Sequence, residues 1–115
     1  MLIDDSATVR MQASRALSEA GFRIIEAVDG LDALEKLQKS PEIALIVCDV
    51  NMPRMDGIAF VERVASEPHP PILMLTTEGH PQLIQRAKAS GAKGWMVKPF
   101  KPDLLVAAAR KLTGT

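Results

Sequence analysis

The stretch from Ala44 to Gly57 reads ALIVCDVNMPRMDG, and it decides the fold. Residues 44–48 are apolar without alternation, which is typical of a central parallel strand covered by helices on both faces. The run ends at one carboxylate, Asp49, after which come a proline, a second acid and a glycine. An unpaired charge at the edge of a core is costly, so Asp49 is the first candidate for a functional group.

Along the rest of the chain, short apolar runs alternate with longer stretches of helical period. This alternation predicts a doubly wound, three-layer α/β domain with a five-stranded parallel sheet, in which the third strand lies between the first and the fourth. The predicted strands cover residues 1–3, 22–27, 43–48, 72–75 and 94–97. The predicted helices cover residues 6–20, 31–40, 58–66, 81–90 and 102–113.

The length of 115 residues suits one domain, and we expect residues 1–115 to form a single unit. The 14 basic and 14 acidic residues cancel, which argues against nucleic acid and anionic membrane surfaces as partners. No apolar run approaches the roughly 18 residues of a membrane span, so we expect a cytoplasmic protein without membrane insertion. Cys48 is the only cysteine, and we expect a small core residue in a reducing compartment rather than a nucleophile.

Polar side chains stand at the carboxyl ends of four of the five predicted strands. These residues are Asp4 and Asp5 after the first strand, Asp49 after the third, Thr76 and Thr77 after the fourth, and Lys98 after the fifth. Because all strands are parallel, these ends meet on one rim of the sheet, which is where doubly wound folds bind their ligands. Convergence of several ionisable groups in one place indicates a functional site.

Three carboxylates on one rim repel one another, which leaves two remedies open: some bind protons, or a divalent cation binds between them. Mg²⁺ suits the second remedy because it takes one or two carboxylates, a carbonyl and several waters. Asp49 is then a candidate nucleophile that forms an acyl phosphate, with Lys98 and Thr76 contacting the other phosphoryl oxygens. Asp56, by contrast, precedes Gly57 and is interpreted as the cap of the following helix.

Four motifs together resemble a known family. LIDDSATVR, VCDVNMPRMDG, LMLTTEG and GWMVKPF, in this order, are similar to the receiver domains of bacterial two-component response regulators, in particular the stand-alone, CheY-like chemotaxis type. The likeness spans the whole chain. It implies a flavodoxin-like (βα)5 fold with strand order 2-1-3-4-5, and a phosphoacceptor switch rather than a conventional enzyme.

The resemblance also implies roles for individual residues at the rim. A histidine kinase would phosphorylate Asp49, and the phosphoryl group would later be lost by Mg²⁺-dependent autodephosphorylation. Asp5 and Asp49 would bind Mg²⁺ together with the backbone carbonyl of Asn51, while Asp4 would assist through a water molecule. Thr76 and Lys98 would hold phosphoryl oxygens.

Further implied roles concern the switch and its timing. Thr76 and Trp95 would form the switch pair, and Asn51 and Glu78 would tune the lifetime of the phosphoryl group. The Lys98–Pro99 peptide bond is expected to be cis. Two departures stand out: family members carry more apolar residues before the acid pair, so the first strand is short, as in a chain trimmed at its N-terminus, and Trp95 is larger than the usual ring.

The message would pass by docking to a downstream protein, and we expect a role in chemotaxis or motility. The expected docking surface is formed by the fourth helix, the fifth strand and the fifth helix, with Lys88, Lys93, Lys101 and Trp95.

One alternative function is a Mg²⁺-dependent phosphohydrolase of the haloacid dehalogenase type, although Asn51 stands where such enzymes need a second aspartate. An interaction module without phosphorylation is another. A flavin-binding module is excluded, because DDSATVR has no glycine for a phosphate loop.

Overall fold

The computed structural model describes residues 1–77 and 81–115. In this part of the chain the strands are β1 (Leu2–Ile3), β2 (Glu26–Ala27), β3 (Ile46–Asp49), β4 (Ile72–Thr76) and β5 (Gly94–Val97). The helices are α1 (Ala7–Glu19), α2 (Gly30–Lys39), α3 (Gly57–Val64), α4 (Pro81–Ala89) and α5 (Pro102–Thr113). The strands pair in parallel in the order β2-β1-β3-β4-β5, which confirms the predicted fold class and strand order.

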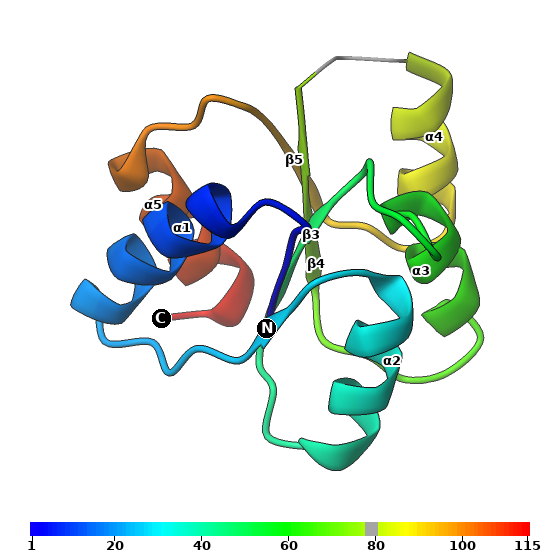
Figure 1. Cartoon of the computed structure of the whole chain (residues 1–115), viewed down its shortest axis with the longest axis horizontal. Helices are drawn as coiled ribbons and strands as arrows, with labels where there is room; N and C mark the ends of the chain where they lie inside the picture. Colours follow the sequence, from blue (N-terminus) through cyan, green and yellow to red (C-terminus); the bar gives the residue numbers. More distant parts are fainter. Residues whose placement is uncertain (78–80) are drawn as a thin grey trace.

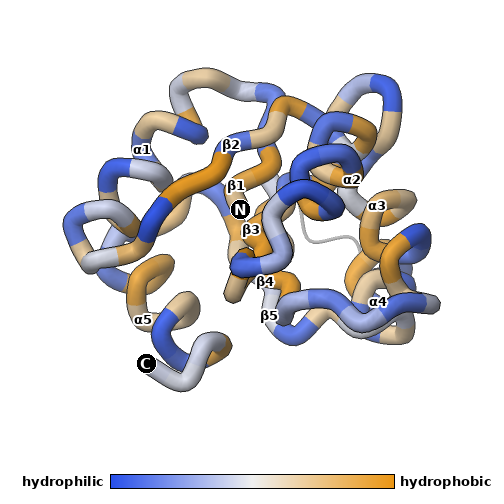
Figure 2. The backbone as a smooth tube through the Cα atoms, turned by 90° about the horizontal axis from the view of Figure 1, so that it is seen from below, coloured by the Kyte–Doolittle hydropathy of each residue, from blue (hydrophilic) through white to orange (hydrophobic). Residues whose placement is uncertain are grey.

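Helices cover the sheet on both faces. Helices α1 and α5 lie on one side, and α2, α3 and α4 lie on the other (Figure 1). The side chains of the strands alternate between two buried clusters. Leu2, Leu45, Val47, Leu73 and Leu75 pack with α1 and α5, whereas Ile3, Ile46, Cys48, Ile72 and Met74 pack with the other three helices. A continuous apolar run such as 44–48 is therefore needed, because both of its faces are buried (Figure 2).

Three helices in the described part of the chain begin at a side-chain cap. Ser6 accepts a hydrogen bond from Val9 at the start of α1, and Asp29 caps α2 in the same way. Asp56 accepts from the backbone N–H of Ala59, 2.8 Å away, which confirms its interpretation as the cap of α3.

Cys48 is fully buried in the sheet, as predicted, and burial raises the pKa of its thiol well above the usual range. A buried thiol of this kind is an inert core residue. None of the helices within residues 1–77 and 81–115 has both the length and the apolar character that crossing a membrane requires.

The strands differ from the prediction mainly at the amino-terminal end of the sheet, where the strands begin. Residues 22–27 and 43–48 were expected to form strands, but the strands are Glu26–Ala27 and Ile46–Asp49, so the expectation for residues 22–25 and 43–45 is wrong. The physical reason is that a strand exists only where it has a partner, and the sole neighbour of β2 is β1, which pairs through two residues. At the opposite rim, Asp49 and Thr76 are the last residues of β3 and β4.

Candidate functional site

Three carboxylates meet at the carboxyl ends of β1 and β3. Ile3 pairs with Cys48, so the residues that follow, Asp4 and Asp49, come side by side. One carboxylate oxygen from each of Asp4, Asp5 and Asp49 lies within 4.8 Å of the others. We call this group the acidic cluster. Asp4 is completely buried, Asp49 is 5% exposed, and Asp5 faces solvent.

Lys98 brings a positive charge to the acidic cluster. Its Nζ donates to Asp4 Oδ2 at 2.7 Å and lies 3.0 Å from Asp49 Oδ1. The backbone N–H of Lys98 donates to the carbonyl of Thr76 at 2.7 Å, so the lysine is tied to the end of β4 as well. The Lys98–Pro99 peptide bond that follows is cis, as expected. The structure therefore brings together five of the residues that the sequence nominated from four different strands.

Burial has the largest single effect on the pKa values of Asp49 and Lys98. Burial raises the pKa of Asp49, and the neighbouring charges of Asp4 and Asp5 add to this effect, while the hydrogen bond with Lys98 opposes it. Partial burial disfavours the charged form of Lys98, but its bonds to Asp4 and Asp49 outweigh that cost and raise its pKa. The buried Asp49 carboxylate therefore stays ionised because the ammonium group of Lys98 lies against it.

The loop after Asp49 is held at its far end by α3. The backbone N–H of Gly57 donates to the carbonyl of Val50 at 2.8 Å, and that of Val50 donates to Leu75 at 3.0 Å. A Cβ atom at Gly57 would collide with the carbonyl oxygen of Asp49, which explains why a glycine follows the cap residue. Close packing of α3 on the end of β3 thus fixes the backbone of the candidate phosphoacceptor.

A second set of contacts, to the start of α2, also holds this loop, and the sequence did not predict it. Arg54, in a left-handed conformation with φ 63°, donates from Nε to the buried carboxylate of Asp29 at 2.7 Å. Next to it, the N–H of Gly30 donates to the carbonyl of Met55 at 3.0 Å. We call these two contacts the α2 latch. Burial disfavours the charged form of Asp29, but the hydrogen bonds from Arg54 and Asp32 lower its pKa. The only hint in the sequence was the Asp-Gly pair before a helix.

The remaining nominated residues lie around this centre. Thr76 is buried and ends β4, two positions after Met74, which pairs with Trp95. Side chains two apart on a strand share a face, so Thr76 and Trp95 lie on the same side of the sheet, on adjacent strands. The half-buried Trp95 packs against the core, and its Nε1 is buried without a hydrogen-bond partner in the described part of the chain. Asn51 is exposed in the loop after β3, and Glu78 lies outside the described residues.

The arrangement suits chemistry on a phosphoryl group. The exposed carboxylate of Asp5, the buried carboxylates of Asp4 and Asp49, a lysine and a threonine are gathered at one rim. Hard divalent cations prefer such oxygen ligands, and lysine complements the oxygens of a phosphate. The acidic cluster therefore fits Mg²⁺ by its donor set.

These features define a doubly wound domain with a candidate phosphoryl site at the carboxyl ends of its strands. The chain belongs to the family described as the response regulator receiver domain, which matches residues 1–110.

Several relatives carry this likeness over nearly the whole chain. Chemotaxis protein CheY1 of Helicobacter pylori is 34% identical over 119 aligned residues, which cover 100% of this chain and 96% of that protein. The crystal structure of chemotaxis protein CheY4 of Vibrio cholerae superposes with a TM-score of 0.89 at 43% identity, covering 96% of this chain and 94% of the other. Transcriptional regulatory protein PdtaR of Mycobacterium tuberculosis is 38% identical over 109 residues, but this chain matches only 53% of its length.

The family assignment leaves the phosphohydrolase alternative without support. The relatives are response regulators, and the position two residues after Asp49 holds Asn51 rather than the acid that such enzymes require.

Proposed function

We propose that this chain is a phosphoacceptor switch whose Asp49 is phosphorylated by a histidine kinase. The observation that carries the proposal is the position of Lys98 Nζ, 2.7 Å from Asp4 and 3.0 Å from Asp49, beside the exposed Asp5. A lysine so placed keeps Asp49 ionised for attack and is within reach of any group added to that carboxylate. Membership of the receiver family supports the same role.

Asp5, Asp49 and the backbone carbonyl of Asn51 would hold Mg²⁺, with Asp4 acting through water. When bound, this ion supplies charge neutralisation for the phosphoryl oxygens and the attacking carboxylate. The chain's own residues do the rest. The Asp49 carboxylate forms the new O–P bond while the P–N bond of the donor phosphohistidine breaks, and its electron pair stays on the imidazole. Lys98 and Thr76 contact phosphoryl oxygens, and α3 and the α2 latch hold the loop that carries Asn51.

The output of the switch would be a change in a docking surface. Phosphorylation replaces the single negative charge of the Asp49 carboxylate with a phosphoryl group of about −1.5 to −2 charges and three acceptor oxygens, which would attract Thr76 and Lys98 and draw the ends of β4 and β5 toward the new group. Movement of the Thr76 hydroxyl would open space on the face that it shares with Trp95. The ring would then turn inward and reshape the surface formed by α4, β5 and α5.

A downstream protein would read this surface. Val97 of β5 and Leu104 of α5 expose 52% and 57% of their surface, and Lys88, Lys93 and Lys101 are exposed on or beside α4, β5 and α5. Exposed apolar area together with cations suits a protein partner with acidic groups. The neutral net charge supports a protein rather than nucleic acid, and the names of the Helicobacter and Vibrio relatives support chemotaxis as the pathway.

Phosphotransfer tests the central claim. Radiolabelled acetyl phosphate with Mg²⁺ should label the parent chain and the control Asp103→Asn, which changes an exposed acid in α5, but should not label Asp49→Asn. Equal labelling of Asp49→Asn and its parent would overturn the proposal. Steady turnover of small phosphate esters would instead favour a phosphohydrolase.

Fluorescence tests the coupling between phosphorylation and the surface. Trp95 is the only tryptophan, so its emission should change when beryllofluoride and Mg²⁺ are added, and the change should shrink at least severalfold in Thr76→Ala. Unchanged emission in the parent would rule out this coupling while leaving phosphorylation intact. The lifetime roles of Asn51 and Glu78 predict fairly rapid loss of the label, and a half-life of many hours would contradict them.

A further inference from the structure

Arg10 ends the LIDDSATVR motif and lies one turn into α1. Side chains on a helix tilt toward its start, so the Arg10 side chain reaches back to the acid pair. Its Nη1 donates to the backbone carbonyl of Asp4 at 2.6 Å, and its Nε donates to Oε1 of Glu26, in β2, at 3.2 Å. The side chain is only 17% exposed, which is uncommon for an arginine and indicates a fixed position.

The contact with Arg10 completes the hydrogen bonding of Asp4. The backbone N–H of Asp4 donates to the carbonyl of Ala27 at 3.1 Å. Its Oδ1 accepts from the N–H of Ser6 at 2.9 Å, and its Oδ2 accepts from Lys98 Nζ at 2.7 Å. β2 ends at Ala27, and the donor for the Asp4 carbonyl is the Arg10 side chain. Such a donor is needed, because a buried carbonyl without a partner is costly.

Holding this carbonyl also orients the backbone of Asp5. The carbonyl of Asp4 and the N–H of Asp5 belong to one planar peptide unit, so a hydrogen bond that fixes the carbonyl fixes the whole plane. Asp5 is exposed, and its carboxylate has no hydrogen-bond partner within residues 1–77 and 81–115. The place of this carboxylate in the acidic cluster therefore depends on its backbone, which Arg10 holds.

Charge alone does not account for an arginine at this position. A positive charge near the acidic cluster repels a divalent cation that binds there, which weakens the site. Geometry gives a better reason, because the planar guanidinium presents several N–H groups in a fixed fork. Arg10 can therefore bind the Asp4 carbonyl and the Glu26 carboxylate at once, and Glu26 sets its orientation.

We propose that Arg10 is a positioning residue for the Mg²⁺ and phosphoryl site. It holds the peptide unit between Asp4 and Asp5, so that the Asp5 carboxylate meets that of Asp49 at one divalent cation, and Glu26 orients Arg10 for this task. Arg10 contacts neither the ion nor the phosphoryl group and acts through the backbone of Asp4. This inference rests on the proposed function, since it assigns a supporting residue to the same site.

Titration of the unfolding midpoint with MgCl₂ tests the proposal without any phosphodonor, since the rise in midpoint reports the apparent dissociation constant of the ion. Loss of the positioning contact should weaken Mg²⁺ binding about tenfold in Arg10→Gln. Arg10→Lys should recover part of that loss, because an ammonium group can still donate to the Asp4 carbonyl. Arg15→Gln is the control in the same helix, where it breaks only an exposed pair with Glu19.

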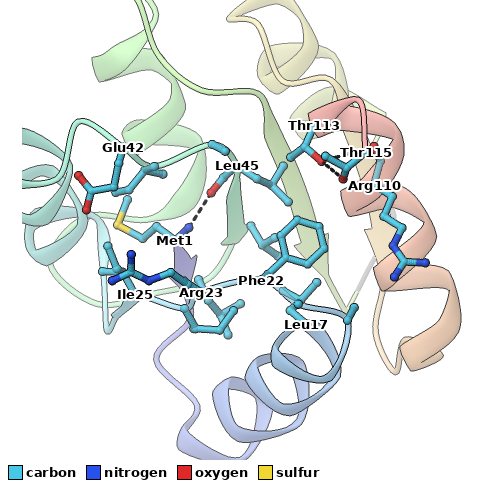
Figure 3. Close-up of a pocket in the computed structure, with 17 residues that line it drawn as sticks. Met1, Leu17, Phe22, Arg23, Ile25, Glu42, Leu45, Arg110, Thr113 and Thr115 are labelled. Carbon is cyan, nitrogen blue, oxygen red and sulfur yellow. Dashed lines mark hydrogen bonds between the residues drawn. The ribbon is translucent and has the colours of Figure 1, made fainter.

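A second control lies at the other end of the sheet. Arg23 lines a cavity at the amino-terminal ends of the strands, together with Met1 and Leu45 (Figure 3). Arg23→Gln and Arg15→Gln each remove one positive charge, as Arg10→Gln does. Both controls should bind Mg²⁺ as the parent does, because neither arginine contacts the acid pair.

The sign of the change separates positioning from charge. If Arg10 acted only through its charge, Arg10→Gln would bind Mg²⁺ more tightly than the parent, because a repelling cation has been removed. Binding that is unchanged or tighter would overturn the proposal. A midpoint that is lower without MgCl₂ but rises with MgCl₂ as much as that of the parent would mean a purely structural role, and it would overturn the proposal too.

Glu26→Ala tests how Arg10 is oriented. It should weaken Mg²⁺ binding less than Arg10→Gln does, and combining the two substitutions should add nothing, since Glu26 acts through Arg10. Additive losses would contradict the role assigned to Glu26. If Arg10→Gln does not fold, Arg10→Lys and Glu26→Ala carry the same comparison. A parent that binds no Mg²⁺ would overturn the ion site of the proposed function, whereas equal binding by parent and variants would overturn only the role of Arg10.

Discussion

A single lysine decides the charge state of the site. Lys98 has a side chain only 12% exposed and contacts two carboxylates that are almost wholly buried. Sequence reasoning placed Lys98 on the same rim as Asp49, because both follow strands of one parallel sheet. It did not predict that Asp4 would be the closer partner, because that choice depends on how β1 and β5 twist relative to each other across β3 and β4.

Removing this lysine should destabilise the fold in a pH-dependent way. Lys98→Met leaves Asp4 and Asp49 buried without their cation, which should lower the free energy of unfolding at pH 7 by about 3 kcal/mol. The pKa of Asp49 is already raised by burial, and loss of Lys98 would raise it further. An acid with a raised pKa penalises the fold above that pKa, so the penalty should fade as the pH drops through it.

Urea denaturation at pH 7 and at pH 4.5 measures this effect. The control Lys101→Met removes an exposed lysine three residues away and should change stability little at either pH. A loss for Lys98→Met that is the same at both pH values would show that the lysine acts through packing rather than charge.

At the scale of elements, helices were easier to predict than strands. The helix bounds agree with the sequence pattern within one or two residues, since amphipathic period and caps such as Ser6 are local signals. The fate of residues 22–25 was not local, because it depends on a partner strand. The sequence did not predict the α2 latch either, because Asp29 and Arg54 are 25 positions apart and neither belongs to a periodic pattern.

The α2 latch should contribute to stability and to the site together. Asp29→Asn keeps a good helix cap but loses the ion pair with Arg54, so it isolates the latch. We expect a decrease in stability at pH 7 that is smaller than that of Lys98→Met, because the Arg54 side chain is 58% exposed, and slower labelling of Asp49.

Acid should abolish this difference. The pKa of Asp29 is lowered from 3.8, so its contribution is present above about pH 3.8 and disappears as the pH falls through the lowered value. Denaturation curves of parent and variant should therefore converge in strong acid. Glu35→Gln, which breaks an exposed helix pair with Lys39, serves as the control and should leave labelling of Asp49 unchanged. Persistent divergence in acid would mean that the carboxylate charge is not what holds the latch.

At the scale of the whole molecule, the proposed Mg²⁺ site would couple ion binding to folding. Unfolding disperses Asp4, Asp5 and Asp49, so a cation bound between them stabilises only the folded chain. MgCl₂ at 100 times its dissociation constant should raise the free energy of unfolding by about 2.7 kcal/mol. Asp5→Asn should remove most of this gain, and without Mg²⁺ it should be at least as stable as the parent, because it relieves repulsion.

Thermal unfolding with and without MgCl₂ measures the coupling. Asp103→Asn, an exposed acid away from the cluster, should respond to Mg²⁺ as the parent does. A parent chain whose midpoint does not move at 20 mM MgCl₂ would count against the ion site. Convergence of these acids was predictable from the parallel sheet alone, whereas their separate burial, from the exposed Asp5 to the enclosed Asp4, required the structure.

The bond between Lys98 and Asp4 joins positions 94 residues apart, so the reactive centre is assembled late. A nascent chain emerging from the ribosome therefore exposes Asp4 long before Lys98, the cation that balances it, has been made. Until then, burial of Asp4 would leave its charge unpaired, so this edge of the sheet should stay open and solvated. For the phosphoacceptor role proposed above, competence would thereby depend on synthesis of Lys98, and chains that end before it would not accept the phosphoryl group from a kinase.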